Sequence, residues 1–238
     1  MLSTLGSTSA SPALLPISPK LLRAEQLIEL QSRRARVLKR SGDILFSLTV
    51  LTLGSPVFLA LALLVKISSR GPVFYVQQRV GRDYRSFGCI KFRTMRRDAD
   101  RILYRLLSES ADLQEEFRND FKLRNDPRIT RLGRFLRRSS LDELPQFLNV
   151  LRGEMSLVGP RPIVRQELPR YGDLMEEVLA VRPGLTGLWQ VSGRNNLSYD
   201  ERVALDLRYA RHRSVWMDLS IIAKTIGVIL DPRDRGAY

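Results

Sequence analysis

The longest apolar stretch of the chain runs from Ile44 to Val65, 22 residues without a charged side chain. A straight helix of that length would reach about 33 Å, enough to cross the hydrocarbon core of a membrane. The triplet Gly54-Ser55-Pro56 lies near its middle, where Pro56 removes the helical hydrogen bond to the carbonyl of Thr52 and its ring clashes with the preceding turn. The pattern therefore predicts two helical halves with a break at Ser55-Pro56.

Basic residues flank both ends of this stretch. Those before it are Arg33, Arg34, Arg36, Lys39 and Arg40, and those after it are Arg70, Arg79, Arg82 and Arg85. The positive-inside rule consequently gives no orientation and suits a segment with both ends in the cytoplasm. A re-entrant helix-break-helix explains both the flanking charge and the proline, although a spanning helix kinked at proline is a common alternative. The first basic run suits anionic membrane lipids or, equally, a solvated basic helix.

Outside this stretch, the periodicity predicts mostly helices and one small β-hairpin. The runs Val73 to Gln78 and Phe87 to Phe92 are β-prone and are joined through Gly81-Arg82-Asp83, which suits a hairpin turn. Helical periodicity covers four further segments, Leu21 to Arg40, Arg96 to Phe121, Leu141 to Leu151 and Ser214 to Leu230. The predicted fold class is therefore mostly α with a small β-hairpin (α+β).

The two ends of the chain differ in character. The stretch Met1 to Lys20 is rich in Ser, Pro and Leu and has no basic region ahead of an apolar run, which predicts a disordered tail rather than a signal peptide. The segment Ser214 to Leu230 is mostly apolar but is interrupted by Asp218 and Lys224. It suits a helix lying in the membrane interface better than one crossing it, and a core helix is an equally simple alternative.

Composition limits the partners and the kinds of catalytic site that the chain could have. The chain has 39 Lys+Arg against 25 Asp+Glu, a formal charge of +14, which predicts anionic partners: nucleic acid, an acidic membrane surface or phosphorylated substrates. The single cysteine, Cys89, excludes an internal disulfide and a cysteine cluster for zinc, and the single histidine, His212, argues against a His-based triad. Any catalysis would rest on carboxylates, Lys and Arg, and a hard cation.

Two adjacent carboxylates, Asp142 and Glu143, follow a cluster of arginines. Pro145 is comfortable only in the first turn of a helix, so a helix begins close to these carboxylates. The positive helix end and the arginines favour the ionised form, which a nucleophile or a metal ligand needs. A structural alternative is that Ser140 and Glu143 form a capping box, or that Asp142 is itself an N-cap.

Several motifs follow one another between about Lys39 and Asp218. They are the broken apolar segment with Ser55-Pro56, Lys91-Phe-Arg93-Thr-Met95, Asn125-Asp-Pro-Arg-Ile-Thr130, Arg138-Ser-Ser-Leu-Asp142-Glu143-Leu-Pro-Gln, Gly153-Glu-Met-Ser-Leu-Val-Gly-Pro-Arg161-Pro162 and Arg182-Pro-Gly-Leu-Thr-Gly-Leu-Trp-Gln-Val-Ser-Gly-Arg194-Asn195. On these motifs the chain resembles the monotopic phosphoglycosyltransferases, the bacterial sugar transferase family. The resemblance covers roughly three quarters of the chain. The chain resembles the minimal catalytic form of the family.

The resemblance implies a two-step transfer at the cytoplasmic face of the bacterial inner membrane. By position in the family, Asp142 attacks the β-phosphate of a UDP-sugar and releases UMP, and polyprenyl (undecaprenyl) phosphate then takes the phosphosugar from the aspartate. Magnesium, matched in the family to Asp142, would neutralise the diphosphate. Glu143 would position the metal or manage a proton.

The resemblance also assigns the substrate contacts. Lys91, Arg138, Arg161 and Arg194 match positions that contact phosphate, uridine or acceptor. The prolines on either side of Arg161 hold its backbone nearly fixed, which lowers the entropic cost of presenting a guanidinium to phosphate, although a rigid connector is the alternative. Galactose or glucose is the expected sugar, by analogy with relatives that initiate exopolysaccharides. A homodimer is a further possibility, because interfacial helices often pair.

Patterning and resemblance together predict a monotopic membrane protein with interfacial amphipathic helices. Its parts are a disordered tail (1–20), a basic helix with a re-entrant membrane helix (21–70) and a cytosolic or interfacial catalytic domain (71–238). A nucleic-acid-binding protein would need interleaved aromatics on strands or a helix-turn-helix, and it would leave the apolar stretch unexplained. A noncatalytic membrane scaffold would tolerate loss of the carboxylates, whereas Asp142 and Glu143 are both present.

Overall fold

The computed structural model describes residues 33–120, 123, 125–193 and 196–230, so the predicted tail over 1–20 and the first part of the predicted helix from Leu21 lie outside the described residues. The apolar stretch forms α2 (Arg33–Leu53) and α3 (Ser55–Ser68), which meet at an angle of 64°. This confirms the predicted break. No single described helix is long and apolar enough to cross a membrane, but this bent pair together is.

The break depends on small local constraints. Gly54 lies between the helices, and a Cβ atom there would be 2.4 Å from the carbonyl oxygen of Val50, so a larger residue would force the backbone apart. Pro56 sits in the first turn of α3, where its missing N–H leaves no bond unmade. The backbone still connects across the break through the N–H of Phe58, which donates to the carbonyl of Gly54 at 2.9 Å.

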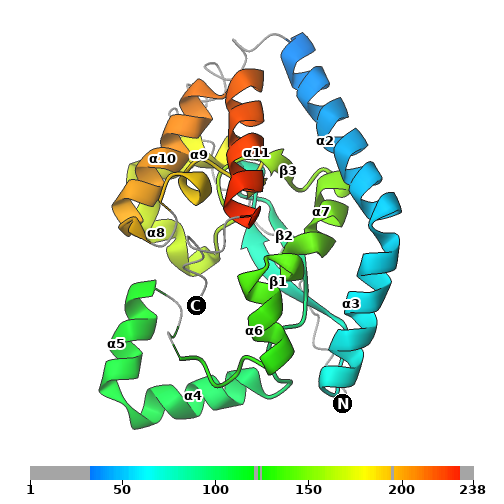
Figure 1. Cartoon of the computed structure of the whole chain (residues 1–238). Helices are drawn as coiled ribbons and strands as arrows, with labels where there is room; N and C mark the ends of the chain where they lie inside the picture. Colours follow the sequence, from blue (N-terminus) through cyan, green and yellow to red (C-terminus); the bar gives the residue numbers. More distant parts are fainter. Residues whose placement is uncertain (1–32, 121–122, 124, 194–195, 231–238) are drawn as a thin grey trace, which may run out of the picture.

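Helices α2 and α3 run along one edge of the molecule in both views (Figure 1). Of the α3 side chains only Leu61 and Val65 are buried, against Phe92 and Leu136. Burial of these two side chains stabilises the fold by about 3–6 kcal/mol. The outer faces of both helices leave large apolar side chains exposed, among them Leu45, Leu53, Leu59 and Ile67. An apolar surface of this size is typical of a membrane or protein contact.

The predicted hairpin is confirmed. Strands β1 (Phe74–Val80) and β2 (Ser86–Phe92) pair antiparallel from Phe74↔Phe92 to Val80↔Ser86, joined by the 3-10 turn η1 (Arg82–Tyr84). The first strand extends two residues past its predicted end. Arg93, directly after β2, donates to the carbonyls of Val65, Ser69 and Pro72, and so fastens the end of α3 to the hairpin.

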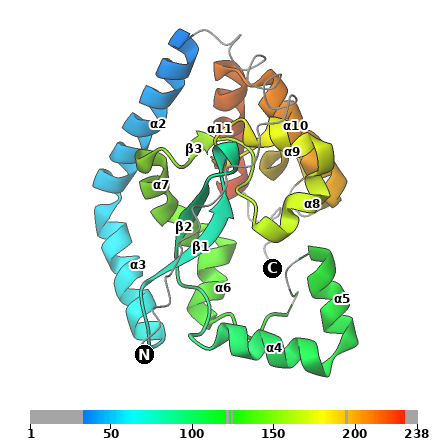
Figure 2. The same ribbon diagram turned by 180° about the vertical axis from the view of Figure 1, so that it is seen from behind.

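The single helix predicted from Arg96 to Phe121 is wrong. The structure has α4 (Ala99–Glu109) and α5 (Ala111–Asp120), separated by Ser110 in an extended conformation (φ −141°, ψ 119°). The Ser110 hydroxyl accepts a hydrogen bond from the N–H of Leu113, so this serine starts a second helix instead of continuing the first. The two helices form an arm that projects from the rest of the molecule (Figure 2).

The next segment carries the motif with the two carboxylates. Helix α6 (Arg131–Arg138) is followed by the 3-10 turn η2 (Leu141–Gln146) and by α7 (Phe147–Arg152). The helix predicted from Leu141 therefore begins with a 3-10 turn. After it, β3 (Ser156–Val158) pairs in parallel with β4 (Gly184–Thr186).

The remaining elements are helical and enclose most of the core. They are η3 (Arg165–Glu167), α8 (Leu168–Tyr171), η4 (Gly172–Leu174), α9 (Met175–Leu179), η5 (Trp189–Val191), α10 (Tyr199–His212) and α11 (Val215–Leu230). One core cluster joins β3 to α10 and α11 through Leu157, Val158, Tyr209 and Ile221. The predicted C-terminal helix is confirmed, and the α+β class with it.

Buried polar contacts attach α2 to this body. Lys39 donates to Asp218 of α11 at 2.6 Å, and the Tyr209 hydroxyl donates to the other oxygen of Asp218 at 2.7 Å. Asp43 accepts from the Ser156 hydroxyl at 2.7 Å and from the N–H of Leu157 at 3.3 Å. Because each of these charged groups is buried or half-buried with its partner, losing one would leave a buried group unsatisfied. The apolar helix pair is thus rigidly tied to β3 and α11.

Candidate active site

The two carboxylates are presented by a sharp reversal of the chain between α6 and η2. Ser140 adopts the left-handed conformation (φ 57°), and its side chain makes no capping hydrogen bond. The Glu143 carboxylate turns instead to Lys91 of β2, whose ammonium lies 2.6 Å from it. The capping-box alternative is therefore wrong. Asp142 lies inside η2 and is not an N-cap.

Strand β2 is held beside η2 by one buried amide. The side chain of Asn149, at the start of α7, donates to the carbonyl of Gly88 at 2.7 Å and accepts from the N–H of Ile90 at 3.0 Å. Asn149 is fully buried, so both bonds are made away from competing water. This clamp fixes the position of β2 along η2, and hence the pairing of Lys91 with Glu143.

Asp142 is 7% exposed, and its pKa is raised to about 6. Burial is the main cause and the neighbouring Glu143 adds to it, while Lys91 and Arg137 oppose the rise. The expectation that the helix end and the arginines would dominate is thus wrong, because desolvation of the carboxylate outweighs them. At pH 7 about nine in ten Asp142 side chains would still be ionised. The result is a charged but poorly solvated carboxylate.

Glu143 behaves in the opposite way. Burial acts to raise its pKa, but Lys91 and the more distant Arg161 and Arg79 outweigh burial and lower it. Glu143 is therefore charged and matched by Lys91. In the part of the chain that the structure describes, Asp142 forms no ion pair of its own. The two adjacent carboxylates therefore differ: Lys91 neutralises Glu143, and Asp142 is left without an ion-pair partner among the described residues.

Arg137 is the arginine that lies beside Asp142. Its Nε donates to the Thr94 hydroxyl at 2.9 Å, and burial lowers its pKa while Asp142 is the strongest charge acting to raise it. Gly133, one turn earlier on the same face of α6, lets the helix approach Thr94 closely: a Cβ atom there would be 1.9 Å from the Thr94 carbonyl oxygen. Sequence reasoning chose Arg138 and missed Arg137. The spacing from Gly133 was the available signal, because residues four apart share a helix face.

The other predicted site residues differ in where the structure places them. Arg138 is exposed at the end of α6. Arg161 is half-buried in the loop after β3, with its guanidinium 5.8 Å from the centroid of the Trp189 ring. Arg194 lies outside the described residues. The structure thus brings together Lys91, Asp142 and Glu143, with Arg161 near enough to lower the pKa of Glu143.

Arg79 is a second residue that sequence reasoning left without a role in the site. It is buried on β1, donates to the carbonyl of Pro162 at 2.9 Å and lies 3.6 Å from the Glu167 carboxylate. The N–H of Val80 also donates to the carbonyl of Ile163 at 2.8 Å. Arg79 therefore fastens the proline-flanked loop to the hairpin, which sets where Arg161 stands. The sequence analysis placed Arg79 only among the basic residues after the apolar stretch, just past the predicted β-prone run, which gave no indication of this contact.

The side chains around Asp142 could supply few ligands to a divalent cation. Within the described residues no group of three or more His, Cys, Asp or Glu side chains comes together. A Mg²⁺ ion needs only one or two protein carboxylates when substrate phosphates and water complete its shell. With Glu143 occupied by Lys91, Asp142 is the carboxylate that fits such a site.

The arrangement suits attack on phosphorus. A buried carboxylate with a raised pKa is a competent nucleophile, and cationic groups around it can neutralise phosphate oxygens. Lys91, Arg137 and Arg161 come from β2, α6 and the loop after β3, three segments distant in sequence. The fold thus gathers positive charge around the two adjacent carboxylates.

Comparison with known proteins identifies the family to which the chain belongs. The family model described as "Bacterial sugar transferase" matches residues 34–232. The chain is 49% identical over 209 residues to the undecaprenyl-phosphate galactose phosphotransferase of Salmonella typhimurium, covering 88% of this chain and 43% of that protein. It is 50% identical over 200 residues to the exopolysaccharide production protein ExoY of Rhizobium meliloti, covering 84% and 88%.

A further relative is the UDP-glucose:undecaprenyl-phosphate glucose-1-phosphate transferase of Escherichia coli, 40% identical over 200 residues, covering 80% of this chain and 40% of that protein. The chain therefore spans less than half the length of the Salmonella and Escherichia proteins and most of the length of ExoY. The matched region includes every motif quoted above, and both carboxylates lie within it.

Replacing Glu143 by Gln is expected to lower the pKa of Asp142 below about 6. The change removes the negative charge that raises this pKa, and it leaves Lys91 free to stabilise the ionised aspartate. The pKa can be measured by NMR titration of protein labelled at its aspartate carboxyl carbons, with Asp142→Asn to assign the signal. Glu115→Gln, an exposed change on α5, is the matched control and should leave the titration unchanged. A pKa that stays the same or rises in Glu143→Gln would contradict this account of the site.

Proposed function

Because the chain belongs to the bacterial sugar transferase family, we propose that it moves a hexose 1-phosphate from a UDP-sugar to polyprenyl phosphate and releases UMP. The relatives named above act, by their names, on undecaprenyl phosphate with galactose or glucose. The observation that carries the proposal is the buried Asp142 carboxylate beside the Lys91–Glu143 ion pair. This reaction would initiate an exopolysaccharide, capsule or related glycan.

In the first half-reaction, an oxygen of the ionised Asp142 carboxylate attacks the β-phosphorus of the UDP-sugar. A new bond forms between this oxygen and phosphorus, and the bond from the β-phosphorus to the bridging oxygen breaks. UMP leaves with the electron pair of that bond, and an aspartyl phosphosugar remains. The raised pKa of Asp142 supports this role, because a more basic carboxylate is the better nucleophile while it is still mainly ionised at neutral pH.

In the second half-reaction, a phosphate oxygen of polyprenyl phosphate attacks the same phosphorus. The bond between Asp142 and phosphorus breaks, the carboxylate is restored, and the product is a polyprenyl diphosphate sugar. Water must be kept from the acyl phosphate between the two steps, and the 7% exposure of Asp142 serves that need.

Basic side chains stabilise the charge on the transferred phosphoryl group. Lys91 and Arg137 are the two cations whose charges act on Asp142, and the charge of Arg161 acts on Glu143. Arg138 and Arg194 remain candidates for uridine or acceptor contacts. Guanidinium groups suit this task because they pair with phosphate oxygens in a bidentate way.

A Mg²⁺ ion completes the proposal. Asp142 would hold it together with the diphosphate oxygens of the substrate, and the bound ion would neutralise the diphosphate and so help UMP to leave. Glu143 contributes by holding Lys91 beside the reacting carboxylate.

We further propose that α2 and α3 form a re-entrant membrane segment at the cytoplasmic face of the bacterial inner membrane. Their 64° bend, their exposed apolar faces and the basic residues on both sides of the pair support this placement. Helix α11 would lie in the interface, since Trp216 is 81% exposed on its first turn. Tryptophan is common at membrane interfaces, because its ring is apolar and its N–H can reach water.

Asp142→Asn is expected to lower the rate of lipid-linked product formation by about 10³-fold or more, because it removes the nucleophile while keeping the size of the side chain. The measurement is transfer of radiolabel from UDP-galactose and from UDP-glucose into extractable lipid, in membranes with polyprenyl phosphate. Asp112→Asn, an exposed change on α5, should keep the wild-type rate. Retention of more than a tenth of the rate in Asp142→Asn would refute the covalent route.

Residues on both sides of the apolar pair should be accessible from the cytoplasmic face only. Single cysteines at Arg36 and Arg70, in a chain with Cys89→Ala, can be labelled with an impermeant maleimide in spheroplasts and in inverted vesicles. Labelling of both cysteines in inverted vesicles alone is expected. Labelling of the two positions from opposite faces of the membrane would contradict the re-entrant placement. Pro56→Ala, which restores the helical hydrogen bond, is expected to move the pair toward a spanning arrangement.

A further inference from the structure

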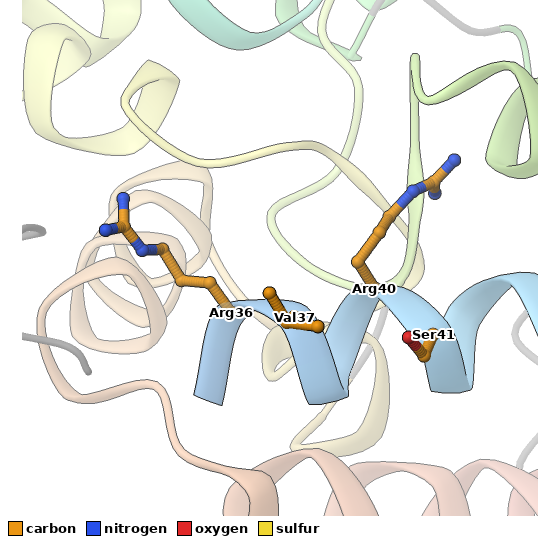
Figure 3. Close-up of a pocket in the computed structure, with 4 residues that line it drawn as sticks. All are labelled: Arg36, Val37, Arg40 and Ser41. Carbon is orange, nitrogen blue, oxygen red and sulfur yellow. The ribbon is translucent and has the colours of Figure 1, made fainter. Parts of the chain in front are cut away.

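A second basic site lies at the other end of α7 from the carboxylates. Arg36, Val37, Arg40 and Ser41 of α2 line a hollow on the surface of the molecule. Figure 3 shows the side chains of Arg36 and Arg40 extending from the same side of α2, one turn apart. No role in the proposed reaction falls to either of them.

The floor of this site is fixed by hydrogen bonds to the end of α7. Arg40 donates to the carbonyls of Val150 and Leu151, at 2.8 and 3.2 Å, and Arg182 donates to the carbonyl of Gly153 at 2.8 Å. Both guanidinium groups are therefore held in place before any ligand binds. A pre-organised arginine loses less entropy when it binds an anion.

Arginines from distant parts of the chain converge here. Burial lowers the pKa of Arg182, and the positive charges of Arg82 and Arg40 lower it further. Burial also lowers the pKa of Arg213, and the positive charges of Arg82 and Arg36 lower it further. Arg182 therefore lies close enough to Arg82 and Arg40, and Arg213 to Arg82 and Arg36, for their positive charges to repel. We call Arg36, Arg40, Arg82, Arg182 and Arg213 the arginine cluster.

Acidic groups near the cluster are already engaged. Asp43 accepts hydrogen bonds from Ser156 and Leu157, and Asp218 accepts from Lys39 and Tyr209. Asp83 pairs with Arg82 at 3.2 Å. Among the described residues, these three engaged carboxylates are outnumbered by Arg36, Arg40, Arg82, Arg182 and Lys39. An anion placed in the hollow would relieve the repulsion.

The surroundings of the hollow indicate what carries the anion. On the same stretch of α2, Val37, Leu38 and Leu45 are 58%, 63% and 68% exposed, and this apolar surface continues along α3. A ligand that fits both features has an anionic phosphate joined to hydrocarbon chains. The geometry points to this hollow as a binding site for the headgroup phosphate of an anionic membrane phospholipid, which the arginine cluster holds while the acyl chains lie along α2. This assignment rests on the proposed membrane placement of α2 and α3.

The site is separate from the one that holds Asp142. Helix α7 has six residues and is about 9 Å long, with η2 before its first residue and the arginine cluster at its last. A phospholipid bound there would also set the depth of α7 relative to the membrane surface, and with it the height of the carboxylates above the lipid acceptor.

The test is a lipid titration followed by native mass spectrometry. The full chain, purified in a neutral detergent, is titrated with phosphatidylglycerol, and bound lipids are counted. We expect one tightly bound phosphatidylglycerol, with phosphatidylcholine of the same acyl chains at least about tenfold weaker. Arg36→Gln and Arg82→Gln, from two different segments, should each weaken phosphatidylglycerol binding about tenfold, the effect of losing one charge-assisted contact. Arg208→Gln, an exposed change of equal charge on α10, should not weaken it.

Three results would overturn the proposal. They are equal affinity for the two lipids, an Arg36→Gln or Arg82→Gln variant that binds as tightly as Arg208→Gln, and displacement of the lipid by millimolar inorganic phosphate at constant ionic strength. The last result would show a site for a soluble anion. Thermal unfolding of each variant checks that the fold is retained.

Failure of this site and failure of the proposed reaction can be told apart. UMP release from UDP-sugar in detergent, without lipid, needs Asp142 but not the arginine cluster, so Arg36→Gln is expected to keep the wild-type rate. A chain that binds phosphatidylglycerol as described but releases no UMP would leave the lipid site standing and reject the reaction.

Discussion

The ion pair between Lys91 and Glu143 is the contact on which the rest of the site depends. It joins β2 to η2 at 2.6 Å, and Asn149 holds the backbone of β2 in place beside it through bonds to Gly88 and Ile90. It neutralises Glu143, the half-exposed neighbour of the buried Asp142, whose negative charge would otherwise raise the pKa of Asp142 further. Asp142 is thereby left charged, weakly solvated and without a partner of its own in the described chain. That combination suits a nucleophile or a metal ligand, because a carboxylate already held in an ion pair within the protein would first have to break it.

The apolar helices are joined to this site by polar contacts. Asp43 and Lys39 of α2 bind β3 and α11, and Arg93 ties the end of α3 to the last residue of β2. The hairpin that presents Lys91 is therefore continuous with the segment that we place in the membrane. Such a connection would hold the reactive aspartate at one depth relative to a lipid acceptor.

Sequence patterning predicted the features that depend on local chemistry. The break at Pro56, the hairpin and the start of a helix near Pro145 follow from missing N–H groups and side-chain alternation, and all three are confirmed. Features that depend on tertiary contacts were missed. Arg137 and Arg138 are adjacent and chemically identical, and only the packing of α6 on Thr94 decides which one faces Asp142. The direction of the Asp142 pKa shift required knowing its burial. The break at Ser110 is a local serine cap that hydrophobic periodicity alone does not detect.

The central claim is that Asp142 carries the phosphosugar between two half-reactions. The most direct measurement mixes the purified chain with UDP-galactose or UDP-glucose and Mg²⁺ in the absence of any lipid acceptor, followed by rapid quench and peptide mass analysis. The account predicts release of UMP in an amount no greater than the enzyme, and a gain of one hexose phosphate on the peptide that contains Asp142. Polyprenyl phosphate should then discharge that label. A strict need for lipid before any UMP is released, with no labelled peptide, would contradict it and favour direct transfer between the two substrates.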